Sequence, residues 1–153
     1  MANTYTQLYI QVVFAVKYRE TLIKDEWKND LYNYITAIIQ NNDHKVIAIN
    51  GVEDHIHILF NMKTDQSVSN LMQNIKAYSS KWINEKSIKK KRFRWQAGYG
   101  AFSYSQSQLS RVAEYIKNQE QHHKEKSMRK EYMEFLQKFE IDYNEAYIFH
   151  EPM

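Results

Sequence analysis

The 153-residue sequence lacks cysteine and contains only one proline and three glycines. Without cysteine the chain cannot form disulfide bridges or thiolate metal sites, and a reducing cytoplasm is the simplest location for it. Because proline and glycine are so scarce, no linker divides the chain, and the sequence shows no internal repeat or low-complexity tract. We therefore expect residues 1–153 to form a single cytoplasmic domain.

Long apolar runs and a strong excess of either charge are also absent. No uninterrupted apolar run approaches the roughly 18 residues that a membrane span requires, so we expect no membrane partner. The start of the chain lacks the basic region and the small-residue cleavage site of a secretory signal, and we expect no signal peptide. The net charge is +3, from 21 basic and 18 acidic residues. This balance permits a nucleic-acid partner without requiring one.

The sequence does contain clear apolar patterns. Period-two stretches predict strands, and apolar residues that recur at three and four positions predict helices. We expect a turn at Asn50-Gly51, and residues 142–150 fit no element clearly. The expected strands are Gln7–Val16, Lys45–Val52, Asp54–Met62 and Trp95–Tyr104, and the expected helices are Lys24–Asn41, Ser67–Glu85, Ser107–Lys124 and Met128–Phe139.

This order predicts an α+β protein with the ferredoxin-like split βαβ arrangement. Such a fold has an antiparallel sheet with two helices on one face, and here additional C-terminal helices follow the last strand. The fold hosts many functions, so the function must be argued from a site.

Two histidines share the expected third strand, in the segment Asp54-His55-Ile56-His57. Alternate residues of a strand point to the same face, about 6.6 Å apart along it. Two neighbouring imidazoles can converge on one divalent cation. The alternative is a solvated polar face, and Asp54 either orients an imidazole or serves as a turn residue, which we favour slightly. A histidine-triad nucleotide hydrolase would need a third alternating histidine, where the sequence has Leu59.

Tyr115 and Gln119 lie one turn apart on the expected helix Ser107–Lys124, at the border of its apolar stripe. If this helix edge covers the sheet face that carries His55 and His57, the four side chains form one site. The alternative is that Tyr115 and Gln119 are ordinary boundary residues with solvated polar ends.

Together these segments resemble the single-tyrosine HUH transposases of small bacterial insertion sequences, the insertion-sequence 200/605 type. The resemblance runs in one order over nearly the whole chain. It rests on residues 13–19 (VFAVKYR), residues 51–57 (GVEDHIH), residues 95–103 (WQAGYGAFS), and residues 115–119 (YIKNQ) with His122-His123.

The resemblance implies a site and a reaction. It makes His55, His57 and Gln119 the protein ligands of Mg²⁺ or Mn²⁺, and Tyr115 the nucleophile that forms a 5′-phosphotyrosine. The implied substrate is single-stranded DNA with a subterminal hairpin at the ends of the element. The resemblance also implies a homodimer, in which the tyrosine helix of one subunit can complete the site of the other.

A basic segment before the last strand is the main candidate for DNA contacts. Lysine and arginine bind phosphates without reading sequence, although a solvated connector is an equally reasonable interpretation. Trp95, Tyr99 and Phe102 could stack on bases, but we favour packing roles for them. The expected DNA-binding residues are Lys89, Lys90, Lys91, Arg92 and Arg94, with Arg19 at the end of the first strand as a weaker candidate.

Two other functions remain open at this point. One is a domesticated relative that applies the same cleavage chemistry to repeated hairpins of the host genome. The other is a non-catalytic module that binds structured nucleic acid, whose binding would be insensitive to chelators and to Tyr115→Phe.

Overall fold

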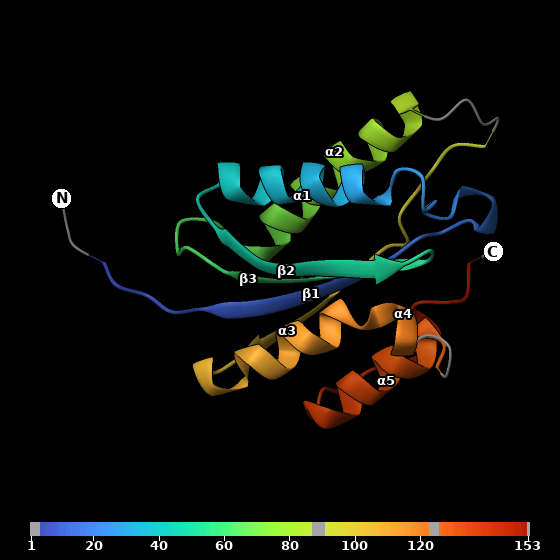
Figure 1. Cartoon of the computed structure of the whole chain (residues 1–153). Helices are drawn as coiled ribbons and strands as arrows, with labels where there is room; N and C mark the ends of the chain where they lie inside the picture. The colour runs from blue at the N-terminus through green and yellow to red at the C-terminus, as the bar shows by residue number, and fades with distance from the viewer. Residues whose placement is uncertain (1–3, 87–90, 123–125, 153) are drawn as a thin grey trace.

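The computed structural model describes residues 4–86, 91–122 and 126–152 (Figure 1). Its strands form one antiparallel four-stranded sheet in the order β2-β3-β1-β4. The strands are β1 (Tyr9–Ala15), β2 (Lys45–Val52), β3 (His55–Asn61) and β4 (Gly100–Tyr104), and the helices are α1 (Lys28–Asn41), α2 (Val68–Lys86), α3 (Leu109–Lys117), α4 (Gln119–His122) and α5 (Met128–Lys138).

The helices cover both faces of this sheet. Helices α1 and α2 lie on one face, and α3, α4 and α5 lie on the other (Figure 1). The order β1-α1-β2-β3-α2-β4 is the predicted ferredoxin-like arrangement, with the C-terminal helices added on the second face. Within the described part of the chain, no helix combines the length and apolarity needed to cross a bilayer.

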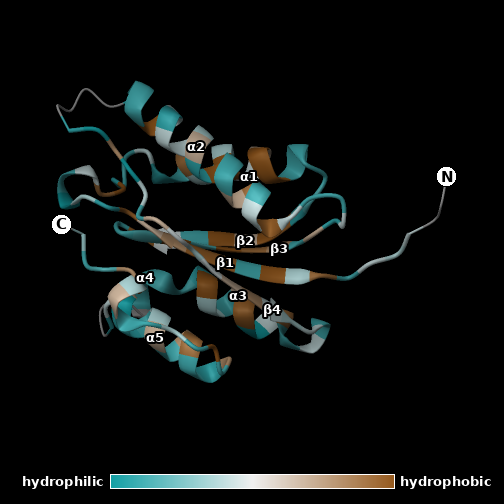
Figure 2. Ribbon diagram, turned by 180° about the vertical axis from the view of Figure 1, so that it is seen from behind, coloured by the Kyte–Doolittle hydropathy of each residue, from teal (hydrophilic) through white to brown (hydrophobic). Residues whose placement is uncertain are grey.

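The larger hydrophobic core lies between the sheet and helices α1 and α2. Alternate residues of β1 and β3 point into it, as the period-two pattern of their sequences requires. Figure 2 shows hydrophobic segments, in brown, in these strands and in the helices that cover them. Fully buried members include Val12, Phe14, Ile56, Ile58, Phe60, Leu31, Ile35, Ile39, Leu71 and Ile75.

The opposite face of the sheet packs against α3 and α5 through two smaller clusters. Ile116 of α3 contacts the cluster that contains Ala48 and Leu59. Met128 and Leu136 of α5 belong to a cluster with residues of β1 and β4. Polar side chains on this face are therefore buried beneath helices.

Most predicted boundaries lie within two residues of the observed ones, and three differ by more for a clear structural reason. Helix α1 begins at Lys28 rather than Lys24, because Trp27 has a non-helical φ of −129°. Strand β4 begins at Gly100 rather than Trp95, because Gly98 adopts a φ of +85°, which is open to glycine but strained for other residues. The expected helix Ser107–Lys124 is interrupted at Asn118, whose φ and ψ of −98° and 23° end α3.

The expected turn at Asn50-Gly51 is wrong. Both residues belong to β2, and the chain turns at Glu53 and Asp54 instead. Gly51 is required for a different reason: a Cβ there would lie 2.1 Å from the carbonyl oxygen of His55. The absence of a side chain lets the two strands approach closely beside the first histidine.

The C-terminal segment that fitted no element packs along α5. Phe149 is buried, and its ring stacks on Tyr132 of α5 with centroids 4.8 Å apart. Arg129 donates hydrogen bonds to the carbonyl oxygens of Phe149 and Glu145. Gln96 donates to the carbonyl oxygen of His150 and accepts from its backbone N–H, so this segment ties α5 to the loop before β4.

Candidate active site

The two histidines of β3 lie in the buried layer beneath the C-terminal helices. His55 and His57 point away from the core formed with α1 and α2, and both are 0% exposed. Their ring centroids are 5.1 Å apart. The interpretation of this pair as a solvated polar face is therefore wrong.

Tyr115 and Gln119 approach the histidines from the helix side. The Oε1 atom of Gln119 lies 3.3 Å from Nε2 of His55, and Gln119 is fully buried. The Tyr115 ring centroid lies 6.1 Å from that of His57. The structure thus brings the four predicted site residues together within a single chain.

The position of Tyr115 depends on how α3 ends. Asn50 of β2 donates hydrogen bonds to the carbonyl oxygens of Ile116 and Lys117, at 3.1 and 3.0 Å. These bonds satisfy carbonyl groups that the end of α3 would otherwise leave unpaired. The chain then re-enters a short helix, α4, that directs Gln119 toward His55.

A fifth side chain, Glu131 of α5, enters the same site and was not predicted. The residue is almost completely buried, at 3% exposure. Oε1 lies 2.9 Å from Nε2 of His57 and 3.5 Å from Nε2 of His55, while Oε2 accepts a hydrogen bond from the Tyr115 hydroxyl. One sequence signal could have found it: Glu131 occupies the apolar stripe of its helix, three residues after Met128 and four before Phe135.

The remaining imidazole nitrogens also have buried or half-buried partners. Nδ1 of His55 lies 2.7 Å from Oδ1 of Asp54, and Nδ1 of His57 lies 2.8 Å from Nε2 of Gln11. Tyr104 donates to Oε1 of Gln11 at 2.7 Å. Asp54 is therefore both a turn residue and a partner of His55, so the preference for a turn role alone is wrong. Such contacts fix the orientation of each imidazole ring.

The carboxylates set the charge state of the site when no cation is bound. Burial alone would lower the pKa of His55, but hydrogen bonds to Asp54 and Glu131 outweigh it and raise that pKa to about 9. Burial raises the pKa of the Tyr115 hydroxyl well above its usual value, and the nearby charge of Glu131 raises it further. Without a cation, His55 therefore carries a proton and Tyr115 remains a neutral phenol at pH 7.

The donor atoms suit a divalent cation. The nearest ligand atoms of His55, His57 and Glu131 all lie within 4.8 Å of one another, and Oε1 of Gln119 adjoins His55. Two imidazole nitrogens combined with oxygen donors fit a borderline ion such as Mn²⁺, and the added oxygens also make the set suitable for Mg²⁺. The residues present therefore fit the metal that the sequence resemblance implies.

Comparison with known proteins identifies the family. A family model described as "Transposase IS200 like" matches residues 4–119, which include His55, His57, Tyr115 and Gln119. The chain belongs to this transposase family. Because the match ends at Gln119, α5 and Glu131 lie beyond the part of this transposase that it covers.

Individual relatives agree with this assignment. The ISDra2 transposase TnpA of Deinococcus radiodurans is 24% identical over 118 residues, which cover 74% of this chain and 84% of the relative. The crystal structure of a putative transposase from the same organism has a TM-score of 0.60 at 19% identity, covering 78% of this chain and 95% of that one. A REP-associated tyrosine transposase bound to a REP hairpin has a TM-score of 0.58 at 12% identity, covering 80% and 73%. The two solved structures share the fold of this IS200-like transposase.

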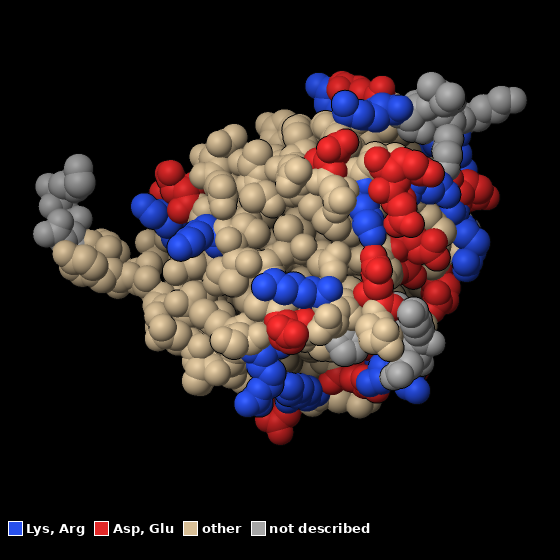
Figure 3. Space-filling model, viewed as in Figure 1, with Lys and Arg blue, Asp and Glu red and all other residues tan. Residues whose placement is uncertain are grey.

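A cavity of about 310 Å³ opens beside Tyr115 between α3 and α5 of the transposase. Its lining includes Tyr115 and Glu131 at the site and the exposed cations Arg111 and Lys138. A second cavity, of about 620 Å³, lies next to Asp54 and has mostly acidic charged groups. Figure 3 shows acidic side chains gathered on that part of the surface, near the end of β2. A phosphate would therefore meet favourable charge mainly from the Arg111 side.

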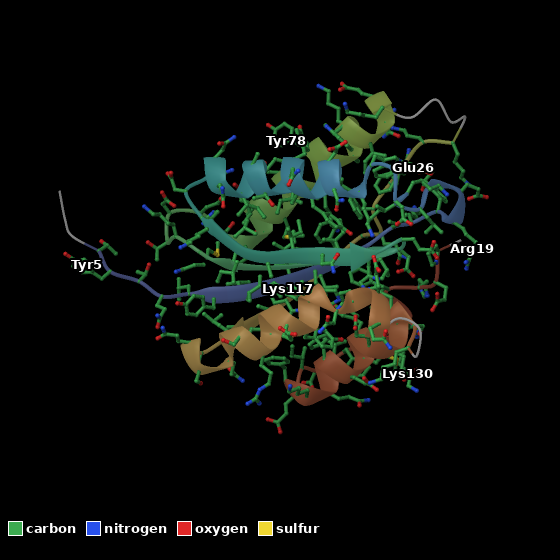
Figure 4. All side chains as sticks on the ribbon, viewed as in Figure 1. Tyr5, Arg19, Glu26, Tyr78, Lys117 and Lys130 are labelled. Carbon is green, nitrogen blue, oxygen red and sulfur yellow. The ribbon has the colours of Figure 1, made fainter. Side chains whose placement is uncertain are left out.

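The predicted DNA-binding residues that the structure describes lie near the end of β1 and the turn that carries Asp54. Arg19 is exposed there (Figure 4). Nζ of Lys91 lies 4.2 Å above the Tyr18 ring and 3.6 Å from Oε2 of Glu20, so Lys91 adjoins Arg19. Arg92 and Arg94 are exposed, whereas Lys89, Lys90 and His123 lie outside the described residues. Their contacts with DNA stay a prediction.

Two of the three aromatic residues considered for base stacking, Trp95 and Phe102, are buried, and the third, Tyr99, is partly buried against the larger core. Trp95 packs edge-on against Phe14 and donates a hydrogen bond to Ser79. Phe102 is buried against Phe135 of α5. The packing role that we favoured from the sequence is therefore the one observed for both side chains.

Proposed function

We propose that this transposase is a metal-dependent single-strand DNA endonuclease and strand transferase in which Tyr115 is the nucleophile. His55, His57 and Gln119 hold a divalent cation, Mg²⁺ or Mn²⁺. The observation that carries the proposal is the convergence of these four side chains on one buried site, with the Tyr115 hydroxyl beside the histidine pair.

The residues match what phosphodiester cleavage requires. A phosphodiester repels nucleophiles because it is negatively charged, and its alkoxide is a poor leaving group. A divalent cation supplies positive charge and orients the phosphate when it is bound. The contacts of Asp54 with Nδ1 of His55 and of Gln11 with Nδ1 of His57 orient the two rings so that both Nε2 atoms face the site.

Tyr115 must lose its proton to attack, because even a phenol with the ordinary pKa near 10 is a weak nucleophile at neutral pH, and burial raises the pKa of this one further. Oε2 of Glu131 already accepts a hydrogen bond from this hydroxyl and is the base nearest to it. As the phenol oxygen bonds to phosphorus, its proton passes to Oε2 and the bond from phosphorus to the 3′ oxygen breaks. The 3′ oxygen takes a proton from water, and the hydroxide formed is neutralised by the proton that Glu131 releases. The products are a 5′-phosphotyrosine and a free 3′-hydroxyl, which can be rejoined to another strand without an external energy source.

The substrate we propose is a single-stranded end of the mobile element that carries a hairpin. The related REP-associated transposase was solved bound to a REP hairpin. Arg111 and Lys138 would contact the phosphates next to Tyr115, and Arg19, Lys91, Arg92 and Arg94 would contact those farther away. Since each chain has one such tyrosine, cleavage at two ends needs two subunits, which favours a homodimer.

The test is covalent capture of DNA. Labelled single-stranded oligonucleotides that tile both strands of the DNA flanking the protein's own gene are incubated with protein and Mn²⁺, then run on a denaturing gel. We expect a Mn²⁺-dependent protein–DNA adduct with the wild-type protein and none with Tyr115→Phe. Tyr78→Phe is the matched control, because Tyr78 is half exposed on α2, on the opposite side of the sheet (Figure 4).

Two results would contradict the proposal. Hairpin binding without an adduct on any oligonucleotide would make the protein a non-catalytic binding module. An adduct that survives Tyr115→Phe would place the nucleophile elsewhere. Adducts on repeated hairpins of the host genome, but not on the flanking DNA, would identify a domesticated endonuclease with the same chemistry.

A further inference from the structure

Among the described residues, Glu131 is the acidic side chain that α5 buries beside the two histidines. It is held by α5, which begins with Ser127 accepting a hydrogen bond from the backbone N–H of Lys130. The adjacent Tyr132 packs on Phe149 of the C-terminal segment. A buried carboxylate is costly unless charged or polar partners offset its desolvation, and here the partners are His55, His57 and Tyr115.

The distances around Glu131 match those between neighbouring ligands of one ion. With metal–ligand bonds of about 2.1 Å, adjacent ligand atoms lie about 3.0 Å apart in an octahedron and about 3.4 Å apart in a tetrahedron. Oε1 of Glu131 is 2.9 Å from Nε2 of His57 and 3.5 Å from Nε2 of His55. Oε1 of Gln119 is 3.3 Å from the same His55 atom. All of these separations fall near one edge length of a coordination polyhedron.

We propose that Glu131 is a fourth protein ligand of the catalytic cation, through Oε1, and that its second oxygen holds the Tyr115 hydroxyl beside that cation. This inference rests on the proposed function, and it adds to it a negatively charged ligand supplied by α5. The carboxylate connects the metal site to the nucleophile directly, because its two oxygens face the two groups separately.

A carboxylate ligand would change the character of the site. Two neutral imidazoles and an amide oxygen bring no charge, whereas Glu131 adds one negative charge to balance the cation. Oxygen-rich, charged ligand sets shift preference toward Mg²⁺ and Mn²⁺ over softer ions. The same carboxylate also limits how far Tyr115 can move from the ion while the hydrogen bond persists.

The contrasting arrangement is that Glu131 occupies the cation position only in the metal-free protein and is displaced when the ion arrives. In that case removing its charge would leave the affinity for the ion unchanged or increase it, since the ion would no longer compete with the carboxylate. The two arrangements are therefore distinguished by metal affinity: only a ligand role predicts that Glu131→Gln weakens binding.

The experiment measures Mn²⁺ binding to the full-length protein without DNA, by the electron paramagnetic resonance signal of the free ion. We expect Glu131→Gln to weaken Mn²⁺ binding by at least about tenfold. Replacing a residue that only hydrogen-bonds to a metal ligand already lowers metal affinity about 10- to 100-fold. Glu131→Asp, which keeps the charge on a shorter arm, should retain more affinity than Glu131→Gln. The matched control is Glu134→Gln, because Glu134 lies one turn along α5 and is exposed in an ion pair with Lys126.

Unchanged or tighter Mn²⁺ binding by Glu131→Gln would overturn the inference. Thermal unfolding in the presence of a chelator shows whether the variant is folded, and Glu131→Asp supplies the second comparison if it is not. The outcome is distinct from failure of the proposed function: a wild-type protein that binds no Mn²⁺ and forms no adduct contradicts both. A wild-type adduct together with full Mn²⁺ affinity in Glu131→Gln contradicts only the role of Glu131.

Discussion

The end of α3 offers a sharp test of how the nucleophile is positioned. Asn50 donates two hydrogen bonds to the last carbonyl oxygens of this helix, directly after Tyr115. Asn50→Ala removes both bonds and leaves the sheet otherwise intact. Since a typical hydrogen bond contributes about 0.5–1.5 kcal/mol, we expect the free energy of unfolding to fall by about 1–3 kcal/mol.

The catalytic effect should exceed what this loss of stability explains. A misplacement of about 1 Å in a reacting group can slow a reaction roughly 100-fold. We therefore expect Asn50→Ala to slow formation of the Tyr115 adduct at least about tenfold at a temperature where the variant is fully folded. The rate is measured by quenching the reaction with labelled DNA and Mn²⁺ at successive times, and stability is measured by urea denaturation.

A matched control exists in the same chain. Asn42 donates a hydrogen bond of 2.8 Å to the carbonyl oxygen of Ile38 at the end of α1, on the opposite side of the sheet. Asn42→Ala should destabilise the protein by about 0.5–1.5 kcal/mol without slowing the adduct. If both variants slow the reaction equally, or neither does, the idea that Asn50 positions Tyr115 is refuted.

Two further predictions concern the stability of the fold. Gly51→Ala should lower the free energy of unfolding by about 3 kcal/mol or more, because its Cβ would meet the His55 backbone. Gly98→Ala should lower it less despite the positive φ, because the space around Gly98 is open. Urea denaturation that ranks the two variants in the reverse order would contradict the steric argument. Burial lowers the pKa of Lys76 to about 8 in the folded protein. Above that pH the unfolded chain binds more protons than the folded chain, so the free energy of unfolding should rise between about pH 8 and pH 10. Lys76→Met should remove this rise, and identical pH profiles for the two proteins would show that Lys76 does not cause it.

The sheet could be predicted from the sequence because its strands show a clear alternation of residue types. In β3, isoleucines alternate with histidines, and strand geometry alone separates the apolar core from the site. The helix that carries Tyr115 could also be oriented from its stripe, since Ile116 packs on the sheet as the periodicity requires. These features depend on local spacing, which a sequence displays directly.

The missed features depend on contacts between distant parts of the chain. Glu131 is 74 residues from His57 in sequence, and only the packing of α5 shows that they meet. The break at Asn118 depends on Asn50, which lies on another element. Gly51 looked like a turn residue, because the sequence cannot show that the backbone of His55 passes against it.

Gln96 contacts Val16 near the start of the chain and His150 near its end, so these contacts can form only late in synthesis. A ribosome that has just added Gln119 has made the histidines and Tyr115, but has not yet made α5 or the segment that fastens it. If Glu131 has the role proposed here, the nascent chain passes through a stage in which the nucleophile exists without its charged metal ligand. The segment that contacts Gln96 is made last, and a chain released before α5 is made would carry Tyr115 without Glu131.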